Sequence, residues 1–186
     1  MPLLDEIWEI VEQCINVISA ETGFGVLIYD ANGSVVRSTD KEQIGDYHAG
    51  AQKIMQNLAD TYAVTAQEAA QNPLVEEGFG CPITIAGKRV GVVGINGKMD
   101  LARPLTIVTV KLIETIKFSE EKYFKAFNSS PVWVVLSSME TGRYIEVNET
   151  FLRTMGYRRE EVIGHTSVEI NSWENHQDRQ IMLDQI

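Results

Sequence analysis

The chain has 186 residues, of which 44% are hydrophobic, so it can bury a core and is too apolar to be disordered. Its formal net charge is −10 at pH 7, and the acidic residues are spread along the whole sequence. This balance excludes the basic surface of a nucleic-acid-binding protein. The net negative charge of the protein repels anions, so an anionic ligand would need a site with its own hydrogen-bond donors or positive charge.

The two cysteines, Cys14 and Cys81, are too few for a disulfide framework, and no spacing of histidine and cysteine indicates zinc. Reduced core cysteines are expected, which favours the cytoplasm. The first residues have no basic segment and soon become acidic, unlike a signal peptide, and no apolar run approaches membrane-spanning length. The sequence therefore predicts a soluble, cytoplasmic protein with no membrane contact.

Residues 3–20 are predicted to form an amphipathic helix, because apolar residues recur at spacings of three and four. This apolar seam consists of Leu4, Ile7, Val11, Cys14 and Ile18. Two uses of the seam remain open. It could pack on the chain's own sheet or on the same helix of a second subunit.

Two β-hairpins are expected in the first hundred residues. Strands at 25–29 and 34–38 flank an Asn-Gly turn, which favours positive φ. Strands at 82–85 and 89–95 form the second hairpin, and the glycines within its second strand indicate a close approach of other groups to the backbone.

Three helices are expected around these hairpins. Apolar spacing predicts the first at 46–58, and a capping-box pattern predicts the second at 65–72, ending before Pro73. The third runs from about 104 to 127. It has no glycine or proline after Pro104, which predicts a continuous helix joining two modules.

A second unit is expected after Pro131. Its predicted elements are strands at 132–136 and 143–147, a helix at 149–155 between an Asn148 cap and Gly156, a short helix at 159–164, and a polar helical stretch up to Ile186. Hairpins flanked by helices predict an α+β fold. We therefore expect a PAS-like antiparallel sheet flanked by helices, a long connecting helix, and then a truncated PAS-like unit.

A carboxylate-binding pocket is predicted where the loop entering the helix at 46–58 faces the strand at 89–97. The N-terminus of a helix exposes amide N–H groups, and its dipole favours an anion by about 0.3–1 kcal/mol. The candidate ligand-binding residues are Ser38, Asp40, Lys41, Gly45, His48, Gly94, Asn96 and Gly97. In this hypothesis the amides near Gly45 and the ring of His48 bind the carboxylate, and Lys41 is the nearest countercharge.

Each candidate also has a structural interpretation. The glycines could serve turn geometry alone, and His48 could simply cap the helix or pack. Ser38 and Asp40 could bond the local backbone, and Lys41 could be solvated.

No enzymatic activity, metal or cofactor is predicted. The sequence contains no Gly-x-Ser-x-Gly nucleophile elbow, no phosphate-binding Gly-Lys-Ser/Thr loop and no metal-spaced His/Glu set. His165 and His176 are lone histidines in polar segments. Trp8, Trp133 and Trp173 are expected in the core or at an interface rather than beneath a cofactor.

Several blocks within residues 1–120 occur in a characteristic order and spacing. They are Tyr29–Gly33, Ser38–Asp40, Ile44–Ala51, Pro82 and Val90–Gly97. In this arrangement they resemble the sugar-diacid recognition domain of carbohydrate diacid regulators. The resemblance implies a PAS-like sensor module that responds to small hydroxy-diacids or hydroxy-acids, although this family often carries arginine in place of residues 40–43.

Residues 121–186 carry a second set of blocks, namely Phe124–Phe127, Val147–Phe151 and Gly156–Gly164. In this order they resemble the first part of a PAS domain. A complete PAS fold has a five-stranded antiparallel sheet, of which only two strands are readable here. The resemblance implies part of a longer signalling protein with an output domain elsewhere.

Together these observations predict a signal-transduction sensor that binds a small organic hydroxy-acid and relays its state through the connecting helix. A homodimer is expected, without direct contact to nucleic acid. The alternatives are a dimerisation scaffold without ligand binding, or a fragment of a transcriptional regulator. The sequence shows no helix-turn-helix segment.

Overall fold

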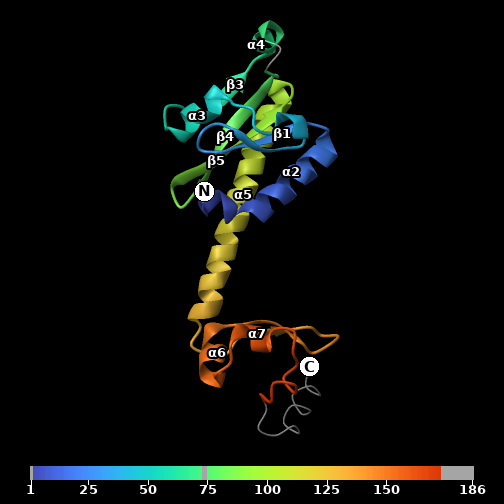
Figure 1. Cartoon of the computed structure of the whole chain (residues 1–186), viewed down its shortest axis with the longest axis vertical. Helices are drawn as coiled ribbons and strands as arrows, with labels where there is room; N and C mark the ends of the chain where they lie inside the picture. The colour runs from blue at the N-terminus through green and yellow to red at the C-terminus, as the bar shows by residue number, and fades with distance from the viewer. Residues whose placement is uncertain (1, 73–74, 173–186) are drawn as a thin grey trace. The chain divides into compact units, whose positions relative to one another are not determined.

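The computed structural model describes residues 2–72 and 75–172, so the expectations for Pro73, Trp173, His176 and the stretch up to Ile186 lie outside the described residues. The chain divides into two compact units, residues 1–119 and 120–186. The elements of the first unit are α1 (Pro2–Asp5), α2 (Trp8–Thr22), β1 (Val26–Tyr29), β2 (Val35–Ser38), the 3₁₀ helix η1 (Lys41–Gln43), α3 (Ala49–Met55), β3 (Tyr62–Val64), α4 (Ala66–Gln71), β4 (Gly78–Ile85), β5 (Lys88–Asn96) and α5 (Met99–Ser129), the last of which continues into the second unit (Figure 1).

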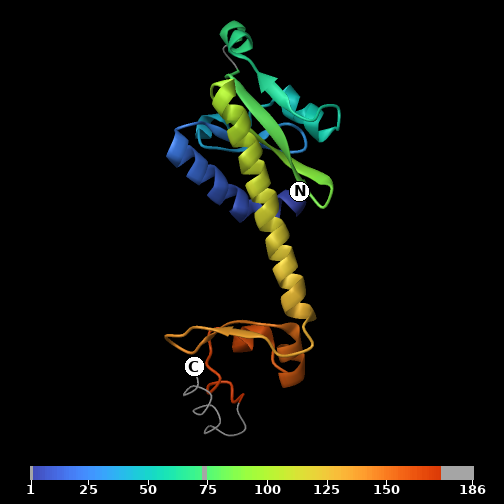
Figure 2. The same ribbon diagram turned by 180° about the vertical axis from the view of Figure 1, so that it is seen from behind.

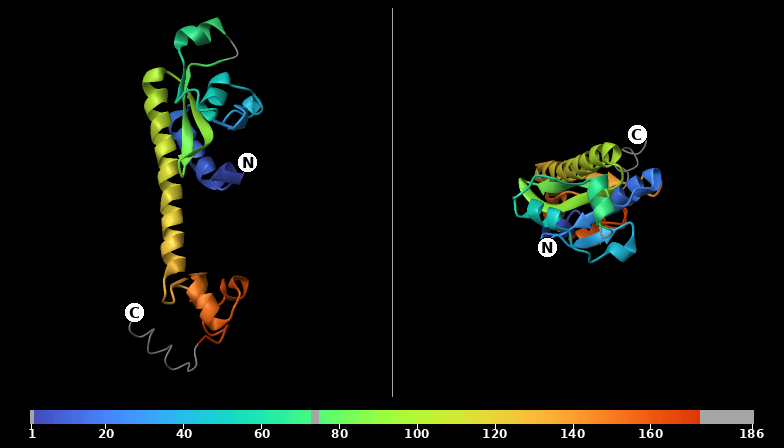
Figure 3. Two further views of the ribbon diagram at one scale, coloured as in Figure 1. Left: turned by 90° about the vertical axis from the view of Figure 1, so that its left-hand side faces the viewer. Right: turned by 90° about the horizontal axis from the view of Figure 1, so that it is seen from above.

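The first unit is built on an antiparallel sheet with the strand order β2-β1-β5-β4-β3. Helices α2 and α5 cover one face, and α3 covers the other (Figures 2 and 3). All of β1 is buried because successive side chains enter opposite cores. Val26 and Ile28 face α2 and α5, whereas Leu27 and Tyr29 face α3. The predicted antiparallel sheet flanked by helices is confirmed.

The N-terminal seam packs on the chain's own sheet. Leu4, Ile7, Val11 and Cys14 are buried in the core beneath the sheet, and Ile18 packs against the same core. The predicted single helix is wrong in one respect, because it is interrupted between α1 and α2 at Glu6 and Ile7. This interruption accompanies the complete burial of Ile7.

Helix α3 is shorter than the predicted helix at 46–58. Residues before it belong to the edge of the sheet, since the Val35 N–H donates to the Asp46 carbonyl at 2.8 Å and the Gly45 N–H donates to the Val35 carbonyl at 2.8 Å. At its other end the Arg89 guanidinium binds the Ile54 carbonyl at 2.5 Å. Contacts with distant strands, which local periodicity does not show, therefore set both ends.

Other elements of the first unit also differ from the prediction. Strand β3 was not predicted, and β4 begins at Gly78 rather than Pro82, because glycines lower the strand signal of its first half. Helix α5 begins at Met99 and carries Pro104 within it. The Met99 N–H donates to the Glu77 side chain at 2.8 Å, so a residue 22 positions earlier in the sequence caps this helix.

The second unit contains β6 (Val135–Ser137), β7 (Tyr144–Val147), α6 (Glu149–Met155) and α7 (Arg159–Val162). Its described strands form one antiparallel hairpin, as predicted, although β6 covers Val135–Ser137 rather than 132–136 and α7 ends at Val162 rather than at 164. Asn148 caps α6 by accepting from the Phe151 N–H at 3.0 Å, and Gly156 ends the helix in the left-handed conformation, also as predicted. Its core consists of Tyr144, Val147, Phe151, Leu152, Val162 and Ile170.

Trp8 and Trp133, the tryptophans of the described residues, and His165 make contacts within the fold. Trp8 packs against the core with the Arg37 guanidinium 4.3 Å above its ring, and Trp133 meets the ring of Phe151 edge-on. The His165 carbonyl accepts from the Tyr144 N–H.

Candidate functional site

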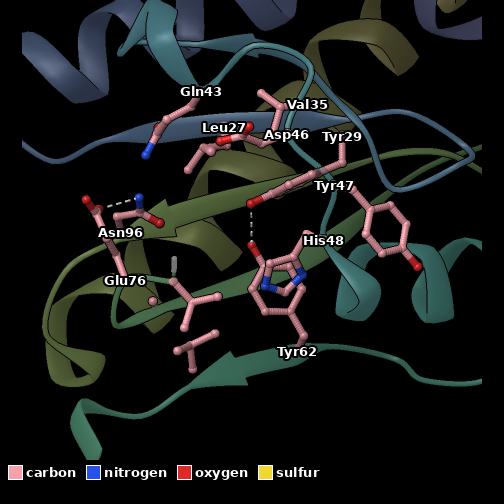
Figure 4. Close-up of a pocket in the computed structure, with 13 residues that line it drawn as sticks. Leu27, Tyr29, Val35, Gln43, Asp46, Tyr47, His48, Tyr62, Glu76 and Asn96 are labelled. Carbon is pink, nitrogen blue, oxygen red and sulfur yellow. Dashed lines mark hydrogen bonds between the residues drawn. The ribbon is translucent and has the colours of Figure 1, made fainter. Parts of the chain in front are cut away.

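A polar cavity of about 160 Å³ lies in the first unit, on the α3 side of the sheet. Its walls come from all five strands, from η1, and from the loops that precede α3 and β4 (Figure 4). The lining residues are Leu27, Tyr29, Val35, Gln43, Asp46, Tyr47, His48, Tyr62, Val64, Val75, Glu76, Gly78 and Asn96.

Two tyrosine hydroxyls meet in this cavity. The Tyr62 hydroxyl donates to the Tyr29 hydroxyl at 3.2 Å, and the two rings lie edge to face with centroids 6.1 Å apart (Figure 4). Burial raises the pKa of Tyr62 well above its ordinary value of 10.0 and also raises the pKa of Tyr29. Both hydroxyls are therefore neutral hydrogen-bonding groups. Since the Tyr29 oxygen accepts from Tyr62, its own proton is left to donate to another group.

Glycines make room for Tyr62. Gly80 and Gly94 are direct cross-strand partners in β4 and β5, and a Cβ atom on either would overlap the side chain of Tyr62. On the other side, a Cβ on Gly50 would come within 2.8 Å of the Tyr62 Cβ. The absence of these side chains lets an aromatic ring lie against the middle of the sheet.

His48 forms the next part of the wall. Its ring lies over that of Tyr62, with centroids 4.1 Å apart and planes tilted by 34°. The Nδ1 atom accepts from the Ala51 N–H at 3.3 Å and caps α3. Burial lowers the pKa of His48 from its ordinary value of 6.5, so the imidazole is neutral at pH 7 and carries its proton on Nε2. His48 thus supplies a second neutral donor.

Acidic and amide groups also line the cavity. The Asn96 Nδ2 atom donates to Glu76 at 2.6 Å (Figure 4). Asp46 and Glu76 both lie close enough to Tyr29 for their negative charges to add to the rise that burial causes in its pKa. The Tyr47 hydroxyl donates instead to Gln52 at 2.8 Å, and the residue is 59% exposed. Hydroxyl and imidazole donors therefore share this cavity with two carboxylates.

Of the eight residues predicted from the sequence, His48 and Asn96 line the cavity. Gly94 lies against Tyr62 and Tyr29. Gly97 lies against Phe24, and its N–H donates to the Glu77 carbonyl at 2.7 Å.

Ser38 ends β2, Asp40 caps η1 and Lys41 begins η1, and none of the three lines the cavity, although Gln43 at the end of η1 does. The Ser38 hydroxyl donates to the Gln43 side chain at 3.0 Å, and Asp40 accepts from the Glu42 N–H at 3.0 Å. Lys41 is exposed.

The predicted amide cradle is not formed at Gly45. That N–H donates to the Val35 carbonyl, the His48 N–H donates to the Gly33 carbonyl, and α3 begins only at Ala49. The prediction placed the start of the helix too early, because a local pattern cannot show that residues 45–48 bond to the β1–β2 hairpin.

Sequence reasoning missed Tyr29, Tyr62, Asp46, Glu76 and Gln43 as lining residues. One signal was available for Tyr62. Glycines inside strands indicate that a bulky group approaches the backbone, and Gly80 and Gly94 do accommodate this ring.

The strand order, with two helices on one face and a polar cavity beneath a short helix on the other, defines the first unit as a PAS-like sensor fold. The chain belongs to the sugar diacid recognition family, whose pattern matches residues 8–129, and residues 121–185 match the PAS domain family. The carbohydrate diacid regulator of Escherichia coli (strain K12) is 31% identical over 97 residues, which cover 51% of this chain and 23% of that protein. The chain thus spans about a quarter of this relative.

Similar solved structures share little sequence with this chain. The Escherichia coli DhaR(N)–DhaL complex is 12% identical with a TM-score of 0.49, covering 90% of this chain and 70% of that one. A methyl-accepting chemotaxis protein, residues 122 to 287, is 15% identical with a TM-score of 0.42, covering 61% and 89%. The GAF domain of an Acinetobacter phosphoenolpyruvate-protein phosphotransferase is 13% identical with a TM-score of 0.41, covering 64% and 95%.

Family membership and the PAS match fit a sensory or regulatory role. Within residues 2–72 and 75–172, no helix combines the length and apolarity needed to cross a membrane.

Proposed function

We propose that the first unit is a ligand-sensing domain that binds a small hydroxylated organic molecule in the cavity lined by β1, β3 and the loop that precedes α3. One observation carries this proposal. The buried Tyr29 hydroxyl accepts from Tyr62 at 3.2 Å, and its remaining proton has no acceptor among the hydrogen bonds of the described residues. Because Tyr29 lines the cavity, a ligand oxygen there would accept this proton.

The surroundings of Tyr29 support the same class of ligand. The Nε2–H of His48 is a second donor in the cavity wall, and Asp46, Gln43, Glu76 and Asn96 supply acceptors. A volume of about 160 Å³ suits a compound of a few carbon atoms. Hydroxy-acids, which the sequence analysis favours, and uncharged polyols both belong to this class.

A relay from the cavity to α5 has a physical route in the first unit. The glycine pair under Tyr62 lies in β4 and β5, and α5 is attached to β4 at two points. The Thr106 hydroxyl donates to the Ala102 carbonyl within α5 at 2.7 Å and also lies 3.2 Å from the Phe79 carbonyl of β4, and Glu114 accepts from the Thr84 N–H at 2.8 Å. A ligand that moves Tyr62 would bias α5 only if it binds two conformations unequally. Helix α5 continues without a break to Ser129, within the segment that matches the PAS family.

The proposal is regulatory rather than catalytic, and it includes a cytoplasmic location. The Escherichia coli relative is a carbohydrate diacid regulator, and the two cysteines, Cys14 and Cys81, are buried free thiols. Such thiols are common in reducing compartments.

The test is a thermal-shift and calorimetry panel of small polyols, aldonic acids and diacids with the 186-residue chain. A ligand at 100 times its Kd should add about 2.7 kcal/mol to the free energy of unfolding. The Tyr29→Phe variant should lose this gain while keeping its fold, as judged by circular dichroism. A full panel without any shift would contradict the proposal.

A dimerisation scaffold is a second candidate, and one observation favours it. Helix α5 exposes large apolar side chains, namely Leu101, Ile107, Val108, Leu112 and Phe118. Exposed apolar stripes of this kind mark protein interfaces. Light scattering distinguishes the two candidates, because a monomer that still binds ligand would exclude the scaffold.

A further inference from the structure

The charges that line the cavity have one sign. Asp46 and Glu76 are the ionisable acids of the lining, and no lysine or arginine occurs among the lining residues of the described chain. Residues 73 and 74, which precede Val75, are Pro and Leu and add no charge in sequence. His48 is neutral at pH 7 because burial lowers its pKa.

The lysine and arginine side chains near the cavity contact other groups or lie outside its lining. Arg37 lies over Trp8 on the opposite face of the sheet, and Arg89 binds the Ile54 and Ala59 carbonyls together with Asp60. Lys98 borders an adjoining hollow that also contains Glu76 and Glu77. Lys41, the countercharge expected from the sequence, is exposed at the start of η1 and does not line the cavity, although Gln43 of the same turn does. None of these side chains lines the cavity to balance a ligand carboxylate.

The donors and acceptors of the cavity complement hydroxyl groups. Tyr29 and His48 each offer a proton, which a hydroxyl oxygen can accept. Asp46 and Glu76 only accept, and a hydroxyl proton can be donated to them. A carboxylate can satisfy the first pair but is repelled by the second, while an ammonium group can satisfy only the second.

We propose that the occupant of this cavity is an uncharged polyol and that Asp46 and Glu76 exclude dicarboxylates from it. This inference rests on the proposed function, since it specifies the ligand class of the same site. Specificity would come from the two carboxylates, which accept hydrogen bonds from hydroxyl groups and repel carboxylates. Sugar diacids would then be the ligand class after which the family is named, and this chain would bind a different ligand.

The experiment compares matched pairs by calorimetry with the full 186-residue chain. The pairs are glycerol and glycerate, threitol and tartrate, and glucitol and glucarate, with ethanolamine as a cationic probe. At least one polyol should bind ten times more tightly than its acid partner. Tighter binding of an acid or of ethanolamine overturns the inference and leaves the sensing proposal standing, whereas binding by none of the probes overturns both.

A variant without the two negative charges tests whether these charges exclude dicarboxylates. In Asp46→Asn/Glu76→Gln, tartrate or glucarate should bind at least ten times more tightly than in the parent chain, and the preferred polyol more weakly. The matched control is Glu9→Gln/Glu12→Gln, which removes the same charge from exposed positions on α2. An equal gain in acid binding in the control, or no gain in the cavity variant, contradicts exclusion by these two carboxylates.

Discussion

Gly80 of β4 and Gly94 of β5 face each other across the sheet, and the ring of Tyr62 occupies the space that their side chains would fill. The cavity therefore depends on two residues that do not line it. Any side chain at either glycine must displace the ring that His48 covers and whose hydroxyl donates to Tyr29.

Gly94→Ala is expected to destabilise the first unit by about 1–3 kcal/mol, because an added methyl group in a packed region forces side chains and backbone apart. It should also abolish the ligand-induced thermal shift by moving Tyr62. Urea unfolding followed by circular dichroism measures the first effect. The control is Gly25→Ala, where a Cβ would make only an ordinary contact with Asn96 at 3.6 Å, and it should change the stability much less. Equal effects of the two substitutions would refute this account of Gly94.

The two tyrosines should respond differently to loss of their hydroxyls. Tyr29→Phe leaves the buried Tyr62 hydroxyl without its acceptor, which should cost about 1–3 kcal/mol. Tyr62→Phe removes the donor, and the Tyr29 hydroxyl can turn towards the cavity, so the cost should be smaller. Urea unfolding of both variants tests this order. A larger loss for Tyr62→Phe would show that the direction of the hydrogen bond is wrong.

Stability should fall as the pH is lowered through the range in which His48 titrates. Burial lowers its pKa in the folded state below 6.5, so the unfolded chain binds a proton first. The contribution of neutral His48 is complete above about pH 6.5 and is lost progressively as the pH falls towards the lowered folded value. His48→Asn keeps a good N-cap but cannot titrate, so it should show a shallower loss. The measurement is the free energy of unfolding between pH 8 and pH 5, and parallel curves for the two proteins would contradict the assignment.

Asn148 should matter far more than an ordinary helix cap. Its buried side chain accepts from Phe151 and Val134 and donates to the carbonyls of Phe127 and Val132. Asn148→Ala removes a cap worth about 0.5–2 kcal/mol and leaves further buried groups without partners, at about 1–3 kcal/mol each.

Hydrogen exchange in α6 and β7 measures this loss of local stability. The comparison is Thr65→Ala, which removes the exposed capping box of α4 and should cost about 1 kcal/mol or less. Similar losses for both variants would contradict a special role for Asn148.

The elements that could be predicted are those whose signals are local. The β1–β2 hairpin follows from its turn, in which the Asp30 side chain accepts from the N–H groups of Asn32 and Ser34. The capping box of α4 and the two ends of α6 were predicted for the same reason. In each case the hydrogen bonds join residues within about four positions, so the pattern is visible in the sequence.

The cavity could be predicted only in part. His48 and Asn96 were identified, but the amide cradle was wrong because the N–H of Gly45 bonds to Val35 of β2. Tyr29 and Tyr62 come from strands 33 positions apart in the sequence, and no local pattern relates them.

By itself, the sequence determined the family, the antiparallel hairpins and the helix caps, because periodicity, turn residues and capping side chains act over a few positions. Only the tertiary structure decided which polar groups share a cavity and what charge it carries. Strand pairing brings Tyr62, Glu76 and Asn96 together with Tyr29 and His48, and that pairing is set by the burial of two cores on opposite faces of one sheet.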